Sequence, residues 1–147
     1  MNKGYKIIIN MVAVFLIVSC IYSYFHVTGS EIDGVSDISS ICSVTITKRY
    51  HLDEDKQEYS LNAEQIEMLK TLLLNSSFTR DLSSVVYFDD KDMYIIQIDY
   101  NNQQDFLTID CIGNEYISVT NQFSGKHLKI NNSDWKDSLE NIIALSS

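Results

Sequence analysis

The chain has 147 residues, 45% of them hydrophobic, and a formal net charge of −9 at pH 7. The 117 residues after position 30 carry all 20 acidic side chains and nine of the 11 basic ones, so their formal charge is −11. This length suffices for one small domain with its own core but not for two. The negative charge argues against binding to nucleic acid or anionic lipid; it keeps the domain soluble and could attract cations or a basic partner.

The stretch from Ile7 to Val27 carries the clearest signal in the sequence. It is mainly apolar over about 20 residues, the length needed to cross the hydrocarbon core of a bilayer. Lys3 and Lys6 precede it, and no acidic residue occurs before Glu31. We therefore expect a membrane anchor with its N-terminus in the cytoplasm and the rest of the chain outside the cell membrane.

Two kinds of anchor fit residues 1–27. In an uncleaved, single-pass transmembrane helix, three aromatic residues would mark the outer interface: Tyr22, Tyr24 and Phe25. The alternative is a signal peptide, because Ile17-Val18-Ser19-Cys20 resembles the lipobox of bacterial lipoproteins. That resemblance implies that Cys20 would be diacylated and become the mature N-terminus. The apolar and aromatic residues that follow Cys20 favour the uncleaved helix.

Residues 28–40 (TGSEIDGVSDISS) are rich in Gly, Ser and Asp and show no sustained period. We expect them to form a flexible linker between the anchor and a domain at residues 41–147. In that domain, alternation from Ile41 to Tyr50 predicts a half-buried strand with Cys42 on its inner face. The charged segment 51–58 would be a hairpin tip that leads into a short strand at Tyr59.

The next element is a helix with a well-marked start. Asn62 is a suitable N-cap, Gln65 can complete a capping box, and Leu61 and Ile66 are spaced as a hydrophobic staple. The apolar stripe of the helix follows at helical spacing and consists of Ile66, Leu69, Leu72 and Leu73. The helix should end near residues 75–77.

Several strands are predicted after this helix. The stretch 78–92 gives a weak signal, with a candidate strand at residues 84–88. Three alternating segments then predict an antiparallel meander, namely Met93–Tyr100, Phe106–Ile112 and Tyr116–Thr120. Gly113-Asn114 would be a two-residue hairpin turn, and His127–Ile130 a short edge strand.

A final helix should begin at Asn132 or Ser133. Its single apolar face consists of Trp135, Leu139, Ile142 and Ile143, and Trp135 should anchor the core. The chain therefore predicts an α+β fold, with an antiparallel sheet of about 4–5 strands and two helices on one of its faces.

Four segments of the domain resemble those of a known family: SVTIT, SLNAEQIEMLKTLL, YIIQIDY and EYISVTNQFSGKHLKINNSDW. The family consists of small membrane-anchored extracytoplasmic domains from Gram-positive bacteria and has no assigned function. The resemblance covers residues 41–143 and rests on spacing and hydrophobic pattern. It implies the fold and the location, and it supplies no active site.

Cys42 and Cys111 fall on the predicted inner faces of two strands. Outside the cytoplasm, a disulfide between them is permitted, and it would close a loop of about 70 residues. The alternative is a pair of buried thiols that pack as small apolar residues. The sequence alone does not decide, because a disulfide depends on the distance between the two Cα atoms.

No pattern in the sequence identifies an enzyme, a cofactor or a metal site. A catalytic Cys–His pair would use His51 or His127, the histidines of the domain, and Cys42 is the cysteine nearest to His51 in sequence. The predicted inward-facing thiols, however, lack the exposure that a nucleophile needs. HExxH, GxSxG and CxxC motifs are absent. The acidic clusters 53–55 and 89–92 could offer oxygen ligands to Ca²⁺, but neither has the spacing of a calcium-binding loop.

These observations favour a non-enzymatic, membrane-tethered extracytoplasmic binding module. Its partner would be an envelope protein, a secreted factor or a cation, and not nucleic acid. The alternative is a small cell-envelope hydrolase with an unconventional site. A concave pocket that joins a histidine with carboxylates and a thiol would favour the hydrolase, whereas a filled core with an exposed sheet face would favour the module.

Overall fold

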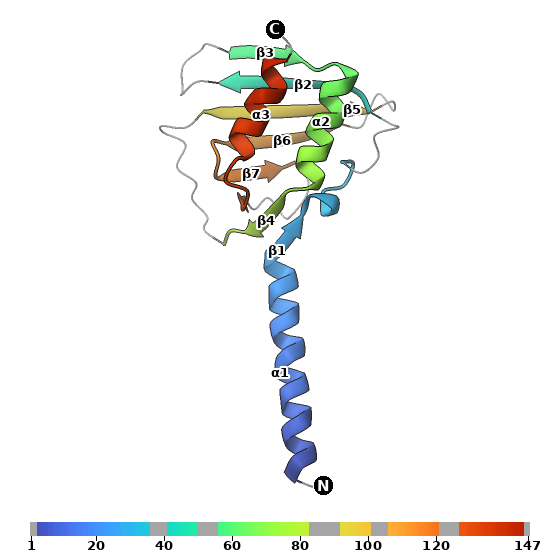
Figure 1. The fold of residues 1–147 in the computed structure, drawn as a ribbon, viewed down its shortest axis with the longest axis vertical. Helices are drawn as coiled ribbons and strands as arrows, with labels where there is room; N and C mark the ends of the chain where they lie inside the picture. The colour runs from blue at the N-terminus through green and yellow to red at the C-terminus, as the bar shows by residue number, and fades with distance from the viewer. Residues whose placement is uncertain are drawn as a thin grey trace.

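The computed structural model describes residues 3–35, 41–49, 56–82, 92–100, 106–120 and 127–145. Within these residues, a long N-terminal helix projects from an α+β domain in which two helices cover one face of an eight-stranded sheet (Figure 1). The helices are α1 (Lys3–Phe25), α2 (Ala63–Leu74) and α3 (Trp135–Ala144), with one 3₁₀ turn, η1 (Gly29–Glu31). The strands are β1 (His26–Thr28), β2 (Ile41–Arg49), β3 (Lys56–Ser60), β4 (Ser77–Arg80), β5 (Met93–Tyr100), β6 (Phe106–Ile112), β7 (Tyr116–Val119) and β8 (Leu128–Ile130).

The predicted N-terminal apolar helix is confirmed as α1. Over Tyr5–Phe25 it is long and apolar enough to cross a membrane, and it is not buried against the described part of the domain. A membrane anchor and a signal sequence both have these properties. The orientation of α1 in a membrane stays a prediction.

The chain passes from α1 into the sheet without a spacer. β1 begins at the residue after α1 and pairs with β4 at one edge of the sheet. The turn η1 follows directly, and Val27, Ile32 and Val35 are buried in the core of the domain. The prediction of a flexible linker over residues 28–40 is therefore wrong for residues 28–35, while residues 36–40 lie outside the described part of the chain.

Gly29 shows why a segment rich in Gly and Ser is ordered here. Its backbone N–H donates to the carbonyl of Ser76 at 3.0 Å, and a Cβ atom at position 29 would lie 1.7 Å from the carbonyl oxygen of Leu73. Glu31 closes the turn by accepting a hydrogen bond from the backbone N–H of Thr28 at 2.6 Å. Glycine thus allows the backbone to approach the end of α2 closely instead of making the segment flexible.

The sheet exceeds the predicted 4–5 strands. All neighbouring strands are antiparallel, and their order within the described residues is β1-β4-β8-β7-β6-β5-β2-β3. The long strands β2, β5 and β6 and the shorter β7 were predicted, whereas β1 and β4 were not, because they are too short to show alternation. β8 was predicted as an edge strand but lies between β4 and β7. The two missed strands therefore form one edge of the sheet.

A β-bulge in β2 reverses the predicted orientation of Cys42. Ile41 pairs with Tyr100 and Ser43 pairs with Asp99, so Cys42 is an additional residue in the register with β5. Val44 and the alternate residues after it face the core, while the thiol of Cys42 is exposed. Because alternation was counted through the bulge, the prediction placed Cys42 on the wrong face.

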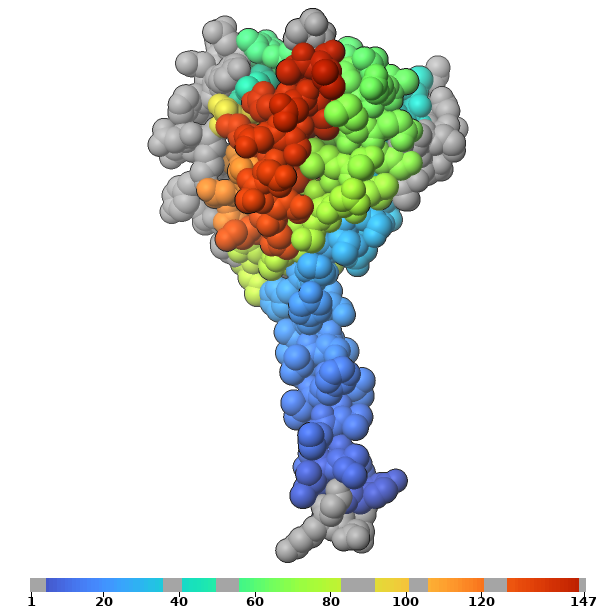
Figure 2. Space-filling model, viewed as in Figure 1, coloured from blue at the N-terminus to red at the C-terminus, as the bar shows by residue number. Residues whose placement is uncertain are grey.

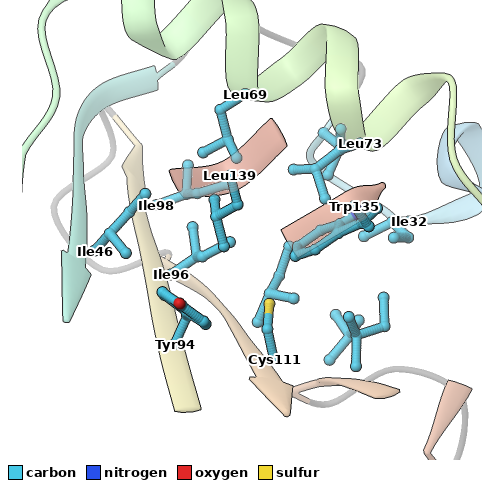
Figure 3. Packing of buried hydrophobic residues seen from close by; sticks show 14 of the residues in the cluster. Ile32, Ile46, Leu69, Leu73, Tyr94, Ile96, Ile98, Cys111, Trp135 and Leu139 are labelled. Atoms are coloured by element: carbon cyan, nitrogen blue, oxygen red, sulfur yellow. The ribbon is translucent and has the colours of Figure 1, made fainter. Parts of the chain in front are cut away.

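α2 and α3 lie side by side on one face of the sheet (Figures 1 and 2). The predicted capping box of α2 is confirmed: Asn62 Oδ1 accepts from the N–H of Gln65 at 3.0 Å, and Gln65 Oε1 accepts from the N–H of Asn62 at 2.9 Å. Leu69 and Leu73 of the predicted stripe are buried. Figure 3 shows side chains of both helices directed towards those of the strands.

The N-terminus of α3 is held by the turn between β6 and β7. α3 begins at Trp135, slightly later than predicted. Oδ1 of Asn114 accepts a hydrogen bond from the N–H of Lys136 at 2.5 Å, and Nδ2 of Asn114 donates to the carbonyl of Ser133 at 2.8 Å. The turn consists of residues 113–115, one more than the two predicted, because the strand register pairs Ile112 with Tyr116. The N-cap residue, Asp134, makes no capping hydrogen bond with its side chain, so a residue distant in sequence supplies this bond instead.

Trp135 confirms its predicted place in the core. Its side chain is completely buried, and Figure 3 shows it beside Leu73 and Ile32. The indole Nε1 donates to Oγ of Ser76 at 2.9 Å, and that hydroxyl donates to the carbonyl of Leu72 at 2.6 Å. The one polar atom of the indole is therefore satisfied inside the core.

Replacing Trp135 should strongly destabilise the fold. Trp135→Ala removes a large buried side chain and leaves a cavity, so we expect the free energy of unfolding to fall by about 3–5 kcal/mol. Denaturant unfolding of the full chain in detergent micelles, followed by circular dichroism, would measure this loss. Leu145→Ala is the control, because that apolar side chain is 60% exposed. Similar effects of the two substitutions would contradict the assigned role of Trp135.

Candidate functional site

A groove of about 410 Å³ lies between α2 and α3 in the described part of the chain. Figure 2 shows the two helices meeting along one line on this surface of the domain. The residues that line the groove are Met68, Thr71, Leu72, Asn75, Asn132, Asp134, Ser138, Asn141 and Ile142. Both apolar and polar side chains therefore line this groove.

The amphipathic patterns of the helices produce the groove. Met68 and Thr71 on α2, and Asn75 just after it, recur at intervals of three and four, next to the stripe that packs on the sheet. Ser138 and Asn141 do the same on α3, in line with Asp134 just before it. Each helix therefore buries its apolar stripe and turns a mainly polar flank towards its neighbour.

Two buried hydrogen bonds between α2 and its surroundings fix the width of the groove. At one end, Nε2 of Gln65 donates to the carbonyl of Ile142 at 2.7 Å. At the other end, the indole of Trp135 donates to Ser76, just beyond α2. These contacts pair the start of each helix with the end of the other, so the helices run antiparallel. Because both ends are fastened inside the core, the groove is preformed.

The polar groups of the groove suit an uncharged partner. Two of them already serve the fold: the hydroxyl of Thr71 donates to the carbonyl of Glu67 at 2.8 Å, and Oδ1 of Asn132 accepts from the N–H of Ser77 at 3.1 Å. Ser138 and Asn141 make no side-chain hydrogen bond with any residue that the structure describes. The lining includes no basic side chain, so it offers amides, hydroxyls and one carboxylate, with apolar contacts between them.

A buried polar cluster lies on the other side of α3 and consists of Lys48, Tyr94 and Glu140. Nζ of Lys48 lies 2.5 Å from Oε1 of Glu140, and the hydroxyl of Tyr94 donates to the same oxygen. The ammonium group is also 5.4 Å from the centre of the Tyr94 ring. Lys48 is only 7% exposed, so its charge is buried and paired.

The protonation states in this cluster indicate a structural role. Burial would raise the pKa of Glu140, but hydrogen bonds from Lys48 and Tyr94, with the charges of Lys48 and Lys136, outweigh it and lower the pKa below its ordinary value. Burial, followed by the hydrogen bond to Glu140, raises the pKa of Tyr94. An ionised Glu140 and a neutral Tyr94 are thus both favoured. Neither group is tuned towards neutral pH, so the cluster fastens α3 to the sheet.

The structure separates Cys42 from Cys111, and both are free thiols. β5 lies between their strands. On β5, Tyr94 pairs with Cys111 on one side and with Lys48 on the other, and Lys48 is six residues along β2 from Cys42. At about 3.3 Å per residue, this offset is on the order of 20 Å, whereas a disulfide requires Cα atoms within about 7 Å. This distance excludes the bridge between them. Cys111 is fully buried, which raises the pKa of its thiol, as does the charge of Asp110.

Of the two described histidines, His26 lies in β1, whereas His127 lies just before β8 on the sheet face opposite the helices. The N–H of Asp81 donates to its carbonyl at 3.1 Å, so the β4–β8 register continues to this pair, and the β7–β8 register places Ser118 on its other side. The sequence analysis missed this Ser118–His127–Asp81 row, which only the strand order creates. Asp110 extends it: burial raises the pKa of this carboxyl, while the charges of Arg49 and His127 oppose that effect.

Serine, histidine and aspartate lie next to one another in this row, as in the catalytic triad of a serine hydrolase, but the hydrogen bonds of such a triad are not all present among the described residues. Neighbouring side chains on a sheet face have Cβ atoms about 5 Å apart, which is compatible with a nucleophile beside a base. A nucleophile–base–acid relay, however, needs hydrogen bonds at both ring nitrogens of the histidine. Nδ1 of His127 is buried and has no hydrogen-bond partner in the described part of the protein. His51, the other predicted base, lies outside the described residues.

The acidic clusters of the sequence give no metal site in the described residues. Asp53, Glu54, Asp55, Asp89 and Asp90 all lie outside that part of the chain. Asp92 is described, and its carboxylate lies 2.7 Å from Nζ of Lys136. Among the described residues, no group of three or more His, Cys, Asp and Glu side chains could hold a metal ion.

Comparisons with known proteins do not identify a relative. No protein-family model matches the chain. Among curated proteins and among solved structures, none is significantly similar to it. Residue chemistry, burial and distances must therefore indicate the function by themselves.

The ion pair of Glu140 should make stability depend on pH. Because its pKa is lower in the folded state, ionised Glu140 stabilises the fold above the unfolded pKa of about 4.3, and this contribution is lost as pH falls through the folded value. Glu140→Gln should therefore be less stable than the unsubstituted chain at neutral pH, and the difference should shrink as pH falls below about 4. Urea unfolding at several pH values would measure it.

Asp137→Asn provides the matched control for this series, because Asp137 is an exposed acidic side chain on the same helix. Its stability relative to the unsubstituted chain should change little with pH. A loss for Glu140→Gln that stays constant down to about pH 3 would contradict the assigned ionised state of Glu140.

Proposed function

We propose that the protein is a membrane-tethered binding module that presents the α2–α3 groove outside the cytoplasm to an envelope or secreted protein. The observation that carries this proposal is a preformed groove with polar side chains, such as those of Ser138 and Asn141, that the described fold does not use. A second, apolar pocket between α2 and the sheet has a volume of only about 10 Å³, space for a single water molecule at most.

The chemistry of the groove supports a protein partner. Side-chain amides and hydroxyls can pair with the N–H and carbonyl groups of a peptide, and Met68, Leu72 and Ile142 offer apolar contacts beside them. The absence of a basic side chain from the lining disfavours phosphate-bearing ligands. The formal charge of −11 on the residues after position 30 disfavours nucleic acid.

The N-terminal helix supports the tether. α1 continues without a break past Cys20 to Phe25, and Tyr22 and Tyr24 are exposed near its end, where an outer interface would lie. An uncleaved, single-pass anchor is therefore proposed in preference to a lipoprotein. Lys3 and Lys6 then remain in the cytoplasm, and the domain lies outside the cell membrane.

A photoreactive amino acid in place of Asn141 should crosslink the full chain to a discrete partner in intact cells. The side chain is exposed at the groove, so a bound protein would lie within reach. The same amino acid in place of Lys129, exposed on the opposite sheet face, is the control. Mass spectrometry of the products would identify the partner. Equal crosslinking from both positions, or none from position 141, would argue against the groove.

Cys20→Ala should leave the anchor unchanged, since alanine is well accommodated in a helix. We expect unaltered electrophoretic mobility, unaltered membrane retention and an N-terminus upstream of residue 20 in intact-mass spectra. External protease should digest the domain and spare a cytoplasmic marker. A chain that begins with diacylated Cys20, and that loses processing in the variant, would establish the lipoprotein instead.

A further inference from the structure

The end of β4 lies beside the end of the N-terminal helix. The register pairs His26 with Thr79, so Arg80 follows opposite the last residue of α1. The guanidinium carbon of Arg80 is 5.0 Å from the centre of the Tyr24 ring, a cation–π contact between the domain and the helix. In Figure 1, this end of β4 lies at the margin of the domain from which α1 projects.

An exposed apolar side chain lies just beyond this contact. The N–H of Asp81 still belongs to the ladder with β8, and Leu82 is the next residue. Two residues of extended chain place Leu82 no more than about 7 Å from Arg80. Leu82 is 59% exposed, and Tyr24, on the nearby helix, is 50% exposed. Apolar and aromatic surface therefore gathers where the domain meets α1.

The junction leaves the domain little freedom to move away from the end of α1. β1 starts at the next residue and is fixed in the sheet, with Val27 1% exposed. The ring of Tyr22 also stacks on that of His26, with their centroids 5.2 Å apart. The position of the end of α1 in a bilayer would therefore set the position of Arg80 and Leu82.

The length of α1 sets that position. The 21 residues of Tyr5–Phe25 span about 32 Å as a helix, close to the roughly 30 Å thickness of a hydrocarbon core. The head-group layer adds roughly 5–7 Å on each side. If α1 spans the bilayer, as in the proposed function on which this inference rests, Arg80, which lies 5.0 Å from the ring of Tyr24, falls at that layer together with Leu82 two residues further on.

We infer that this end of the domain, formed by Tyr24, Arg80 and Leu82, rests on the bilayer and binds phospholipid head groups. The guanidinium of Arg80 pairs with a lipid phosphate, because its planar donors match phosphate oxygens. Leu82 and the ring of Tyr24 contact the glycerol and upper acyl region. The partner is the phosphate common to phospholipids, since the formal charge of −11 on the residues after position 30 disfavours anionic lipids.

A fluorophore at position 82 tests the inference in the full chain. Leu82→Cys is made in a Cys20→Ala, Cys42→Ser background, where the remaining thiol, Cys111, is fully buried and unreactive. The labelled protein is reconstituted in phosphatidylcholine vesicles that contain lipids spin-labelled near the head group. We expect severalfold stronger quenching at position 82 than at a matched control.

Phe106→Cys supplies the control, because Phe106 is 63% exposed but lies on β6, four strands from β1 and thus about 19 Å further from the edge that joins α1. Arg80→Gln should weaken the quenching at position 82, and Arg80→Lys should retain part of it. Equal quenching at positions 82 and 106, in protein that floats with the vesicles, would overturn the inference while the anchor stands.

Two further outcomes separate the alternatives. Protein that fails to float with the vesicles would overturn the proposed membrane anchor and the inference with it. Inorganic phosphate should leave the quenching at position 82 unchanged. If phosphate removes it, Arg80 binds a free anion rather than the bilayer, and the inference fails.

Discussion

The pairing of β1 with β4 is the contact on which the arrangement of the molecule depends. It is only three residues long, yet it attaches the helix to the sheet and places Val27 beside Phe78 in the core. It is supported by the close approach of Gly29 to the end of α2 and by the turn that Glu31 closes. The N-terminal helix is consequently an extension of the folded domain, and its last turn and the sheet edge form one structural unit.

Long periodic segments were predicted well, because burial of one face imposes a repeat that is readable in sequence. The capping box of Asn62 and Gln65 and the core position of Trp135 belong to this group. Three- and four-residue strands such as β1 and β4 were missed, since they pack through neighbours that local sequence does not specify. The bulge at Cys42 placed that side chain on the face opposite to the one predicted. The hydrogen bond from Lys136 to Asn114 at the start of α3 was not predictable, because it joins residues that are distant in the chain.

The groove could not be predicted from the sequence, although both of its flanks are visible there as the polar faces of two helices. What the sequence lacks is the antiparallel approach of α2 and α3, which Gln65 and Trp135 fix through buried hydrogen bonds. The row of Ser118, His127 and Asp81 is hidden for the same reason, because β4, β7 and β8 are neighbours in the sheet but distant in the chain. This row is a weaker indication of function than the groove, since Nδ1 of His127 has no hydrogen-bond partner among the described residues.

The continuous junction between α1 and β1 also couples rotation. A helix joined to a domain by a loose linker can spin about its axis without turning the domain. Here Tyr24 is held against Arg80, and β1 is bound in the sheet, so the azimuth of α1 is locked to that of the domain. If α1 spans a membrane, a contact that selects one side of the helix would therefore also fix the direction, within the plane of the membrane, in which the α2–α3 groove opens.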